Sequence, residues 1–141
     1  MAGRGGLVSA GYVLFRLGER TFATPLSDVR EIVRLTRLEE LPGMRPPLAG
    51  VVVLRGVPLP VFDVRDCPGV TGDVLVMTVD GDEVGVAVDA VTAVLAPDEL
   101  PEGEPPARTL PGYVVGVRHH GDAPVLLVDV HRMLDLKRIP A

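Results

Sequence analysis

The feature that most constrains the fold of this chain is an internal repeat of its apolar segments. Three segments recur at an offset of 62 residues, as from Val29 to Val91, and two more at an offset of 66, as from Gly50 to Gly116. The matched segments are 13–17 with 75–79, 22–26 with 84–88, 29–33 with 91–95, 50–51 with 116–117 and 61–64 with 127–130. One order of segments used twice predicts two units of the same architecture. We therefore expect function where the units meet or where they differ.

The repeated segments are rich in valine, in runs of four to eight residues bounded by Gly, Pro and Asp. Such runs are typical of strands rather than helices, so we predict a mostly β fold. Strands are expected over 12–17, 21–25, 50–54, 58–64, 74–79, 84–88, 113–117 and 125–130, and 91–95 repeats the segment around Val29.

Short helices are expected at two places. Ser27 is predicted to cap a short helix that reaches Ile32 or Val33, with Val29, Ile32 and Val33 on one face. Asp129 is predicted to cap a C-terminal helix in which Val130, Met133 and Leu134 share the buried face. The equivalent residue of the first repeat, Asp63, is expected to end its strand and cap a half-turn over 64–67.

The chain has 141 residues, so each repeat alone would be marginally stable and the two should pack together. We predict a single domain over 12–136, with a first repeat over about 12–66 and a second over about 73–136. Residues 1–11 are expected to form a disordered N-terminal tail and 137–141 a C-terminal tail, with no signal peptide and no apolar run of membrane-spanning length. These features favour a cytoplasmic protein.

Charge and motif content argue against several classes of function. The net charge is −5 and aromatic residues make up 4%, which disfavours binding to nucleic-acid phosphate or stacking on bases. Neither a glycine-rich phosphate loop nor a Cys/His cluster of metal-ligand spacing is present. We expect no catalytic residues, no cofactor and no metal.

Three candidate sites have simpler interpretations. Nothing in the sequence places a base beside Cys67, so a structural thiol is preferred to a nucleophile. His119 and His120, next to Asp122, are interpreted as a solvated hairpin end rather than a metal site. Asp63 and Asp129 occupy equivalent positions, which favours the same capping role over an acid/base pair.

The differences between the repeats are more informative. Arg55 lies at a hairpin tip in the first repeat, and its counterpart in the second is Gly121. Glu31 likewise has Ala93 as its counterpart. Arginine is enriched at the energetic centres of interfaces, so the first repeat is the one expected to carry partner recognition. The simpler alternative is that Arg55 and Glu31 are ordinary surface charges.

A series of motifs resembles one known family in order and spacing, over about Tyr12 to Leu134. The motifs are Phe15 with Thr21-Phe22-Ala23-Thr24-Pro25, Val29-Arg30-Glu31-Ile32, Leu41-Pro42, Gly50-Val51-Val52-Val53-Leu54-Arg55-Gly56, Pro60-Val61-Phe62-Asp63-Val64-Arg65, Val84-Gly85-Val86-Ala87-Val88-Asp89-Ala90-Val91 and Val125-Leu126-Leu127-Val128-Asp129-Val130. On these residues the chain is similar to the CheW-like domain family.

The resemblance implies two SH3-like five-stranded β-barrel subdomains packed side by side. It also implies a non-enzymatic, standalone adaptor that couples the cytoplasmic signalling tips of chemoreceptors to the histidine kinase CheA, through the CheW-like regulatory domain of that kinase. The adaptor would be cytoplasmic and recruited to membrane receptor arrays, without nucleic acid or direct membrane contact. An apolar groove between the barrels would receive a receptor's helical hairpin.

Partner-binding positions of the family fall on Val29, Glu31, Gly50, Arg55 and Gly56. Two of them have structural alternatives: Val29 as a core residue, and Gly50 as a position of close backbone approach, since its counterpart Gly116 is also glycine. For the whole chain, the alternative function is a small β-barrel binding module for nucleic acid or a small ligand, and an enzyme acting through Cys67 comes last.

Overall fold

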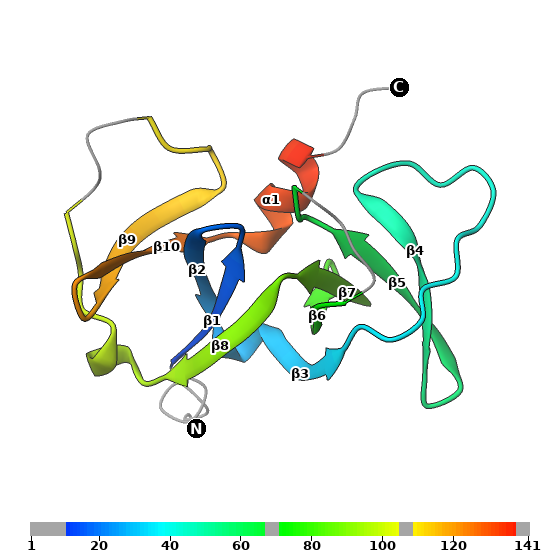
Figure 1. The fold of residues 1–141 in the computed structure, drawn as a ribbon, viewed down its shortest axis with the longest axis horizontal. Helices are drawn as coiled ribbons and strands as arrows, with labels where there is room; N and C mark the ends of the chain where they lie inside the picture. The colour runs from blue at the N-terminus through cyan, green and yellow to red at the C-terminus, as the bar shows by residue number, and fades with distance from the viewer. Residues whose placement is uncertain (1–10, 67–70, 105–108, 138–141) are drawn as a thin grey trace.

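The computed structural model describes residues 11–66, 71–104 and 109–137, and this part of the chain is mostly β (Figure 1). The elements are β1 (Tyr12–Leu17), β2 (Arg20–Pro25), η2 (Leu26–Asp28), β3 (Val29–Arg34), β4 (Leu48–Leu54), β5 (Val57–Asp63), β6 (Asp73–Val79), β7 (Asp82–Val88), β8 (Ala90–Leu95), η3 (Pro97–Glu99), β9 (Val114–His120), β10 (Ala123–Val128) and α1 (Val130–Lys137). The predicted mostly β fold with a C-terminal helix is confirmed. No helix in these ranges is long and apolar enough to span a membrane.

The strands form two five-stranded sheets, and each sheet takes strands from both repeats. Sheet A has the order β8-β1-β2-β10-β9, and sheet B has the order β3-β6-β7-β5-β4. The first hairpin of each repeat, β1–β2 or β6–β7, thus completes a sheet with the last three strands of the other repeat. The boundary between the sheets therefore does not follow the boundary between the repeats (Figure 1).

Two parallel strand pairs hold the exchanged hairpins in place. β2 pairs with β10 through Ala23 and Leu127, and β5 pairs with β7 through Val61 and Gly85. These contacts are equivalent, because Gly85 follows Ala23 by 62 residues and Leu127 follows Val61 by 66. A Cβ atom on Gly85 would lie 2.7 Å from a methyl carbon of Val74, so the joint in sheet B has no room for a side chain there.

The largest core lies between the two sheets. It contains Phe15 and Phe22 from sheet A, whose rings stack with centroids 5.8 Å apart, together with Leu75 and Met77 from sheet B and Met133 from α1. A smaller core lies within each sheet, around Val61 in sheet B and Leu14 in sheet A. Since the main core uses both sheets and the helix, they form one packed body, and burial of its apolar surface is the main stabilising term.

The prediction of a helix from Ser27 to Ile32 or Val33 is wrong. A 3₁₀ turn ends at Asp28, and Val29–Arg34 is strand β3, which pairs antiparallel with β6. Ile32 is 38% exposed, whereas Val33 packs on the core of sheet B, so the two do not share a face. β-branched residues at this spacing fit either a helix or a strand. Pairing with β6 stabilises the strand here.

The C-terminal helix forms as predicted. The Asp129 carboxylate accepts a hydrogen bond from the backbone N–H of Arg132 at 3.1 Å, which caps α1, and Val130, Met133 and Leu134 are buried. Asp63 also accepts a backbone N–H, from Arg65, but residues 64–66 are not helical. The expected half-turn therefore does not form in these residues, and Cys67 lies outside the described part of the chain.

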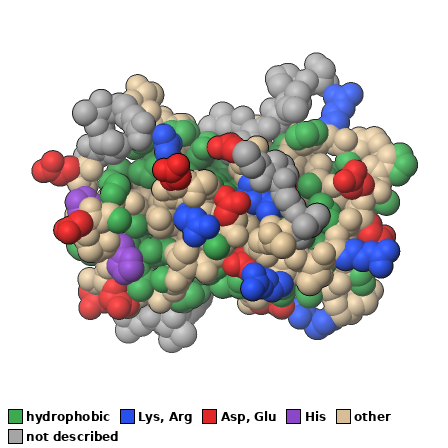
Figure 2. All heavy atoms as spheres, viewed as in Figure 1, with side chains coloured by type: hydrophobic (Ala, Val, Ile, Leu, Met, Phe, Trp, Pro, Cys, Tyr) green, Lys and Arg blue, Asp and Glu red, His purple; other side chains and the backbone are tan. Residues whose placement is uncertain are grey.

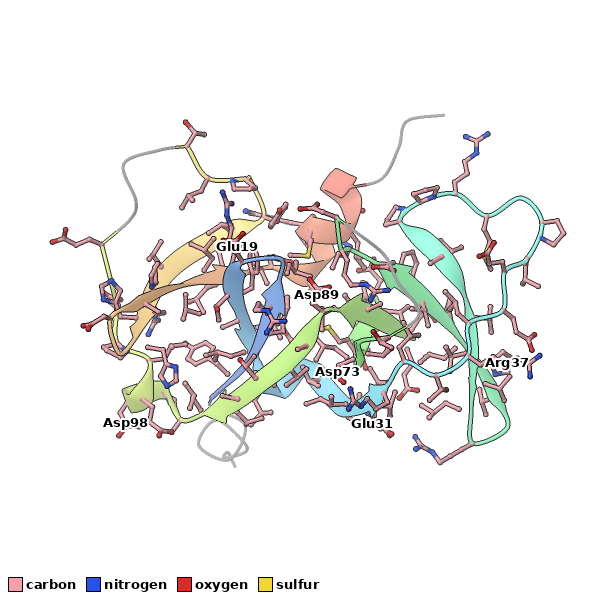
Figure 3. The ribbon with its side chains drawn as sticks, in the orientation of Figure 1. Glu19, Glu31, Arg37, Asp73, Asp89 and Asp98 are labelled. Atoms are coloured by element: carbon pink, nitrogen blue, oxygen red, sulfur yellow. The ribbon has the colours of Figure 1, made fainter. Side chains whose placement is uncertain are left out.

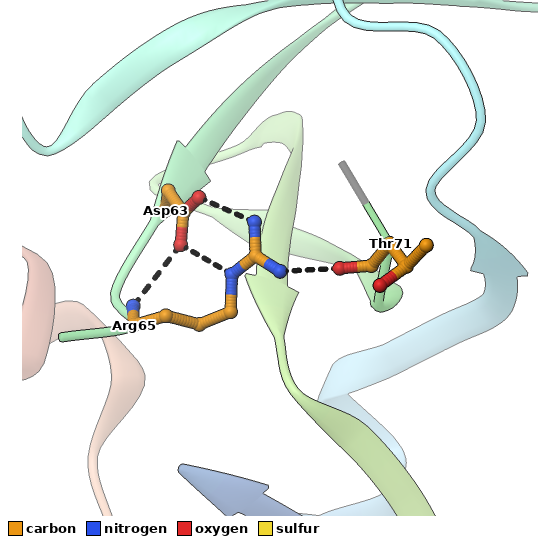
Figure 4. A network of polar contacts seen from close by, with 3 residues as sticks. All are labelled: Asp63, Arg65 and Thr71. Carbon is orange, nitrogen blue, oxygen red and sulfur yellow. Dashed lines mark hydrogen bonds and ion pairs between the residues drawn. The ribbon is translucent and has the colours of Figure 1, made fainter. Parts of the chain in front are cut away.

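Asp63 instead forms a buried ion pair with Arg65 (Figure 4). Arg65 Nε donates to Asp63 Oδ1 at 2.8 Å and Arg65 Nη2 donates to Asp63 Oδ2 at 2.7 Å, while Nη1 donates to the carbonyl oxygen of Thr71. The side chains of Arg65 and Asp63 are only 3% and 8% exposed. The guanidinium therefore ties the end of β5 to the segment that leads into β6.

We expect Arg65→Met to lower the free energy of unfolding by about 3–5 kcal/mol, because it leaves the buried Asp63 carboxylate without its cation. Urea denaturation followed by circular dichroism measures this loss. The double variant Asp63→Asn/Arg65→Met should lose less than the sum of the single losses. Arg132→Met is the control: it removes a long, exposed pair with Asp129 and should cost less than about 1 kcal/mol. Equal losses of stability for Arg65→Met and Arg132→Met would contradict the structural role of the buried Asp63–Arg65 ion pair.

Candidate functional site

The structure brings together Glu31 and Arg55, two charged residues of the first repeat whose counterparts in the second repeat are uncharged. Glu31 lies on β3, and Arg55 lies at the tip of the β4–β5 hairpin. Arg55 Nη1 donates to Glu31 Oε2 at 2.9 Å, and Nη2 donates to Oε1 at 2.6 Å. β3 and β4 are the two edge strands of sheet B, so this two-pronged pair joins the opposite edges of the sheet.

The Glu31–Arg55 pair remains at the surface. The Arg55 side chain is 68% exposed and the Glu31 side chain 32% exposed. The hydrogen bonds from Arg55 are the main cause that lowers the pKa of Glu31, and the charges of Arg55 and Arg30 act in the same direction. Glu31 is therefore ionised at neutral pH and holds the Arg55 guanidinium in a fixed position that a partner can reach.

The backbone of the hairpin tip is strained at Arg55. Arg55 has φ of +51° and the following Gly56 has φ of +79°. Two successive residues with positive φ are what a tight two-residue hairpin requires, and glycine adopts this conformation without steric cost. Gly56 is exposed, and apart from its own chain neighbours no atom lies within 4 Å of where its Cβ would be, so the turn is open to solvent.

The two remaining predicted positions, Gly50 and Val29, lie away from this tip. Gly50 is buried on β4, and a Cβ there would lie 2.6 Å from the carbonyl oxygen of Glu39 and 2.8 Å from Leu38 Cγ. This leaves room only for glycine where the 38–39 segment crosses β4. Val29 is half-buried and packs against the main core. Both positions therefore have the structural roles that were their alternatives, Val29 in the core and Gly50 at a close backbone approach.

Sequence reasoning missed an apolar pair on two edge strands. Ile32 on β3 is 38% exposed and Val94 on β8 is 54% exposed. The last residue of β3 and the start of β8 both contact Asp73, which is labelled in Figure 3. The Asp73 carboxylate accepts the backbone N–H of Val91 at 2.8 Å and lies 3.8 Å from the guanidinium of Arg34. Ile32 and Val94 are separated by 62 residues, so the repeat itself carried the signal. We call these two side chains the edge-strand apolar pair.

The other candidates are possible metal ligands and the two equivalent aspartates. No group of three His, Cys, Asp or Glu side chains is placed to hold a metal ion there. Asp63 and Asp129 each accept a backbone N–H, but within the described residues only Asp129 caps a helix, so the shared capping role is confirmed for Asp129 alone. Acidic and basic side chains are interspersed on the face seen in Figure 2, without a broad basic patch.

We expect the Glu31 carboxyl to titrate below its ordinary value of 4.5 in the folded protein. Because the folded pKa is the lower one, the stabilisation from the pair is present above pH 4.5 and is lost as the pH falls through the lowered pKa. NMR titration of the Glu31 side-chain carbon measures this midpoint. Arg55→Ala should move it up toward 4.5, whereas Arg34→Ala, an exposed arginine on the same strand, should not. A midpoint unaffected by Arg55→Ala would show that the ion pair does not persist in solution.

Comparison with known proteins agrees with this architecture. The family model described as CheW-like domain matches residues 11–138. A chemotaxis protein CheW from Treponema pallidum is 23% identical over 90% of this chain and 83% of its own length, and one from Klebsiella aerogenes is 29% identical over 92% and 84%. The crystal structure of the scaffolding protein TtCheW from Thermoanaerobacter tengcongensis superimposes with a TM-score of 0.72 at 23% identity, covering 89% of this chain and 92% of that one.

The family model therefore spans both sheets and the C-terminal helix, together with the Glu31–Arg55 pair and the edge-strand apolar pair. Together, the matched residues and the shared fold show that this chain belongs to the CheW-like domain family.

Proposed function

We propose that the chain is a non-enzymatic scaffold that couples chemoreceptors to the histidine kinase CheA in a chemotaxis-type signalling array. The observation that carries this proposal is the match of about nine tenths of the chain to two relatives named chemotaxis protein CheW. The description of TtCheW as a scaffolding protein supports the same role. In such an array the phosphoryl chemistry belongs to the kinase, and the scaffold contributes binding surfaces.

The edge-strand apolar pair is suited to a helical partner. Ile32 and Val94 project from the solvent side of β3 and β8, and Arg30 and Arg34 flank Ile32 along β3. An amphipathic helix lays its apolar face on such a surface, and acidic residues at its margins would meet the arginines. The signalling tip of a receptor, which is a helical hairpin, is the partner that we assign to this surface.

The tip around Arg55 supplies a second surface. The arginine is held in place by Glu31 yet keeps most of its side chain in solvent. A pre-oriented arginine loses little conformational freedom on binding, and arginine is one of the residue types that dominate interface energetics. We assign this surface to the CheW-like regulatory domain of the kinase.

Mixing the purified chain with CheA and a receptor signalling fragment, both from the organism that supplies this sequence, should give a ternary complex. Size-exclusion chromatography with light scattering measures its mass. The isolated CheW-like domain of the kinase should bind the chain without the receptor, because the two proposed surfaces share no residue. Absence of binding to both partners would refute the scaffold function.

Arg55→Ala and Glu31→Lys should weaken binding to the kinase domain by roughly tenfold or more, since both remove the oriented guanidinium from the surface. Isothermal titration calorimetry measures the affinity, and thermal unfolding shows whether the fold is kept; we expect the midpoint to change by only a few degrees. Arg20→Ala, which changes an exposed arginine on β2, is the matched control. If Arg20→Ala weakened binding as much as Arg55→Ala, the effect would be one of net charge and the Arg55 surface would be wrong.

A further inference from the structure

A groove of about 300 Å³ lies between the two sheets, next to the start of α1. Its lining is formed by Pro25, Asp28, Met77, Thr78, Val79, Asp80, Val115, Val128, Asp129, Val130 and His131. Apolar side chains make up much of the wall, and Val115 is 56% exposed. The ionisable groups are three carboxylates and one histidine. The groove therefore combines an apolar wall with a negatively charged rim.

The first repeat contains residues equivalent to part of this groove, and there a side chain of the chain itself occupies the position. Asp63 and Arg65 in the first repeat correspond to Asp129 and His131 in the second, at the offset of 66 residues. In the first repeat the Arg65 guanidinium is buried against Asp63, and the charge of Asp89 also favours its protonated form. This copy of the site is thus occupied by a guanidinium from the chain itself.

The second copy of the site lacks this guanidinium. His131 turns away to Asp80, with Nε2 2.9 Å from Asp80 Oδ2, and its side chain is 50% exposed. Hydrogen bonding to Asp80 is the main cause that raises the pKa of His131. Asp129 remains 42% exposed and forms a long ion pair with Arg132 at 3.9 Å, on the adjoining turn of α1. Its charge is also a minor cause that raises the pKa of His131. The carboxylate equivalent to Asp63 is therefore left facing solvent at the groove.

A second carboxylate stands beside Asp129. In the first copy of the site the second carboxylate near the guanidinium is Asp89, whose counterpart at the offset of 62 is Ser27. Asp28 is the residue directly after Ser27. Its side chain reaches solvent, but partial enclosure by its surroundings raises its pKa, and the charge of Asp129 raises it further. No basic side chain is paired with Asp28 in the described part of the chain. Two neighbouring carboxylates without a cation between them favour a positively charged occupant.

We propose that this groove binds an arginine side chain presented by a protein partner, with the guanidinium between Asp28 and Asp129 and the aliphatic stem on the apolar wall. Arginine suits the site better than lysine, because its planar fork matches carboxylates in the way that Arg65 matches Asp63. The volume exceeds that of one arginine, so an aliphatic neighbour on the partner fills the remainder. The carboxylates would repel the phosphates of a nucleic acid.

The test uses the intact chain alone, so its outcome does not depend on the scaffold function. The probe is the peptide acetyl-Val-Arg-Leu-amide, titrated into the ¹⁵N-labelled chain and followed by ¹H–¹⁵N correlation spectra. We expect saturable shifts at the amides of residues 28, 79, 115 and 129–131. A peptide with citrulline in place of arginine, which keeps the shape but removes the charge, should bind roughly tenfold more weakly or not at all. Equal binding of the two peptides would overturn the proposal.

Variants separate this groove from other acidic surface. Asp129→Asn keeps a side chain that can cap α1. Like Asp28→Asn, it should lower the affinity for the arginine peptide several-fold. Asp122→Asn, an exposed carboxylate at the β9–β10 turn, should leave the affinity unchanged. His131→Arg restores the residue type of the first repeat. Its guanidinium should occupy the groove and block binding of the peptide, with the melting temperature unchanged or raised. Unaltered binding in Asp28→Asn and Asp129→Asn would refute the site. Binding of N-acetyl-arginine-amide as tight as that of the peptide would refute a protein partner and assign the groove to a small guanidinium compound.

Discussion

The exchange of strands between the two repeats is the constraint on which the rest of this structure depends. Neither sheet is complete without the parallel pairs β2·β10 and β5·β7, each of which joins strands of different repeats. Gly85 shows how close the approach is, because a Cβ atom there would collide with Val74. The main core then forms between the sheets and under α1. One packed body results, so the partner surfaces that we propose on the two sheets keep a fixed relation to one another.

Two arginine–carboxylate pairs in sheet B have different roles because they differ in burial. Arg65 and Asp63 are almost fully enclosed, so each charge requires the other and the pair is structural. Arg55 and Glu31 make an equally direct contact but remain exposed. A pair in solvent contributes little to stability, and we propose that its role is to orient a guanidinium for a partner. Under this proposal, the same chemistry serves the fold at one site and recognition at the other.

The sequence predicted secondary structure correctly wherever the apolar residues followed a single spacing, either that of a strand or that of a helix. The valine runs predicted the strands, and the helix from Val130 was predicted with its cap and its buried residues. The segment after Ser27 was misassigned, since Val29, Ile32 and Val33 fit a helical face and the edge that β6 offers to β3 cannot be inferred from local sequence. Gly50 was recognised as a candidate for close approach, but the segment that crosses it, residues 38–39, comes from a turn-rich stretch without a periodic pattern.

The sequence by itself determined that there are two related sets of strands, which residues differ between them, and that Glu31 and Arg55 belong to the first set. These properties follow from residue identity and short-range period. Only the tertiary structure decided which strands share a sheet and that Glu31 meets Arg55 across the two edges of one sheet. It also decided that a groove lies beside Asp129, whereas a guanidinium is buried against the equivalent Asp63. The physical reason is that strand pairing is non-local: backbone hydrogen bonds form with any extended partner, and the choice among partners depends on how the whole core packs.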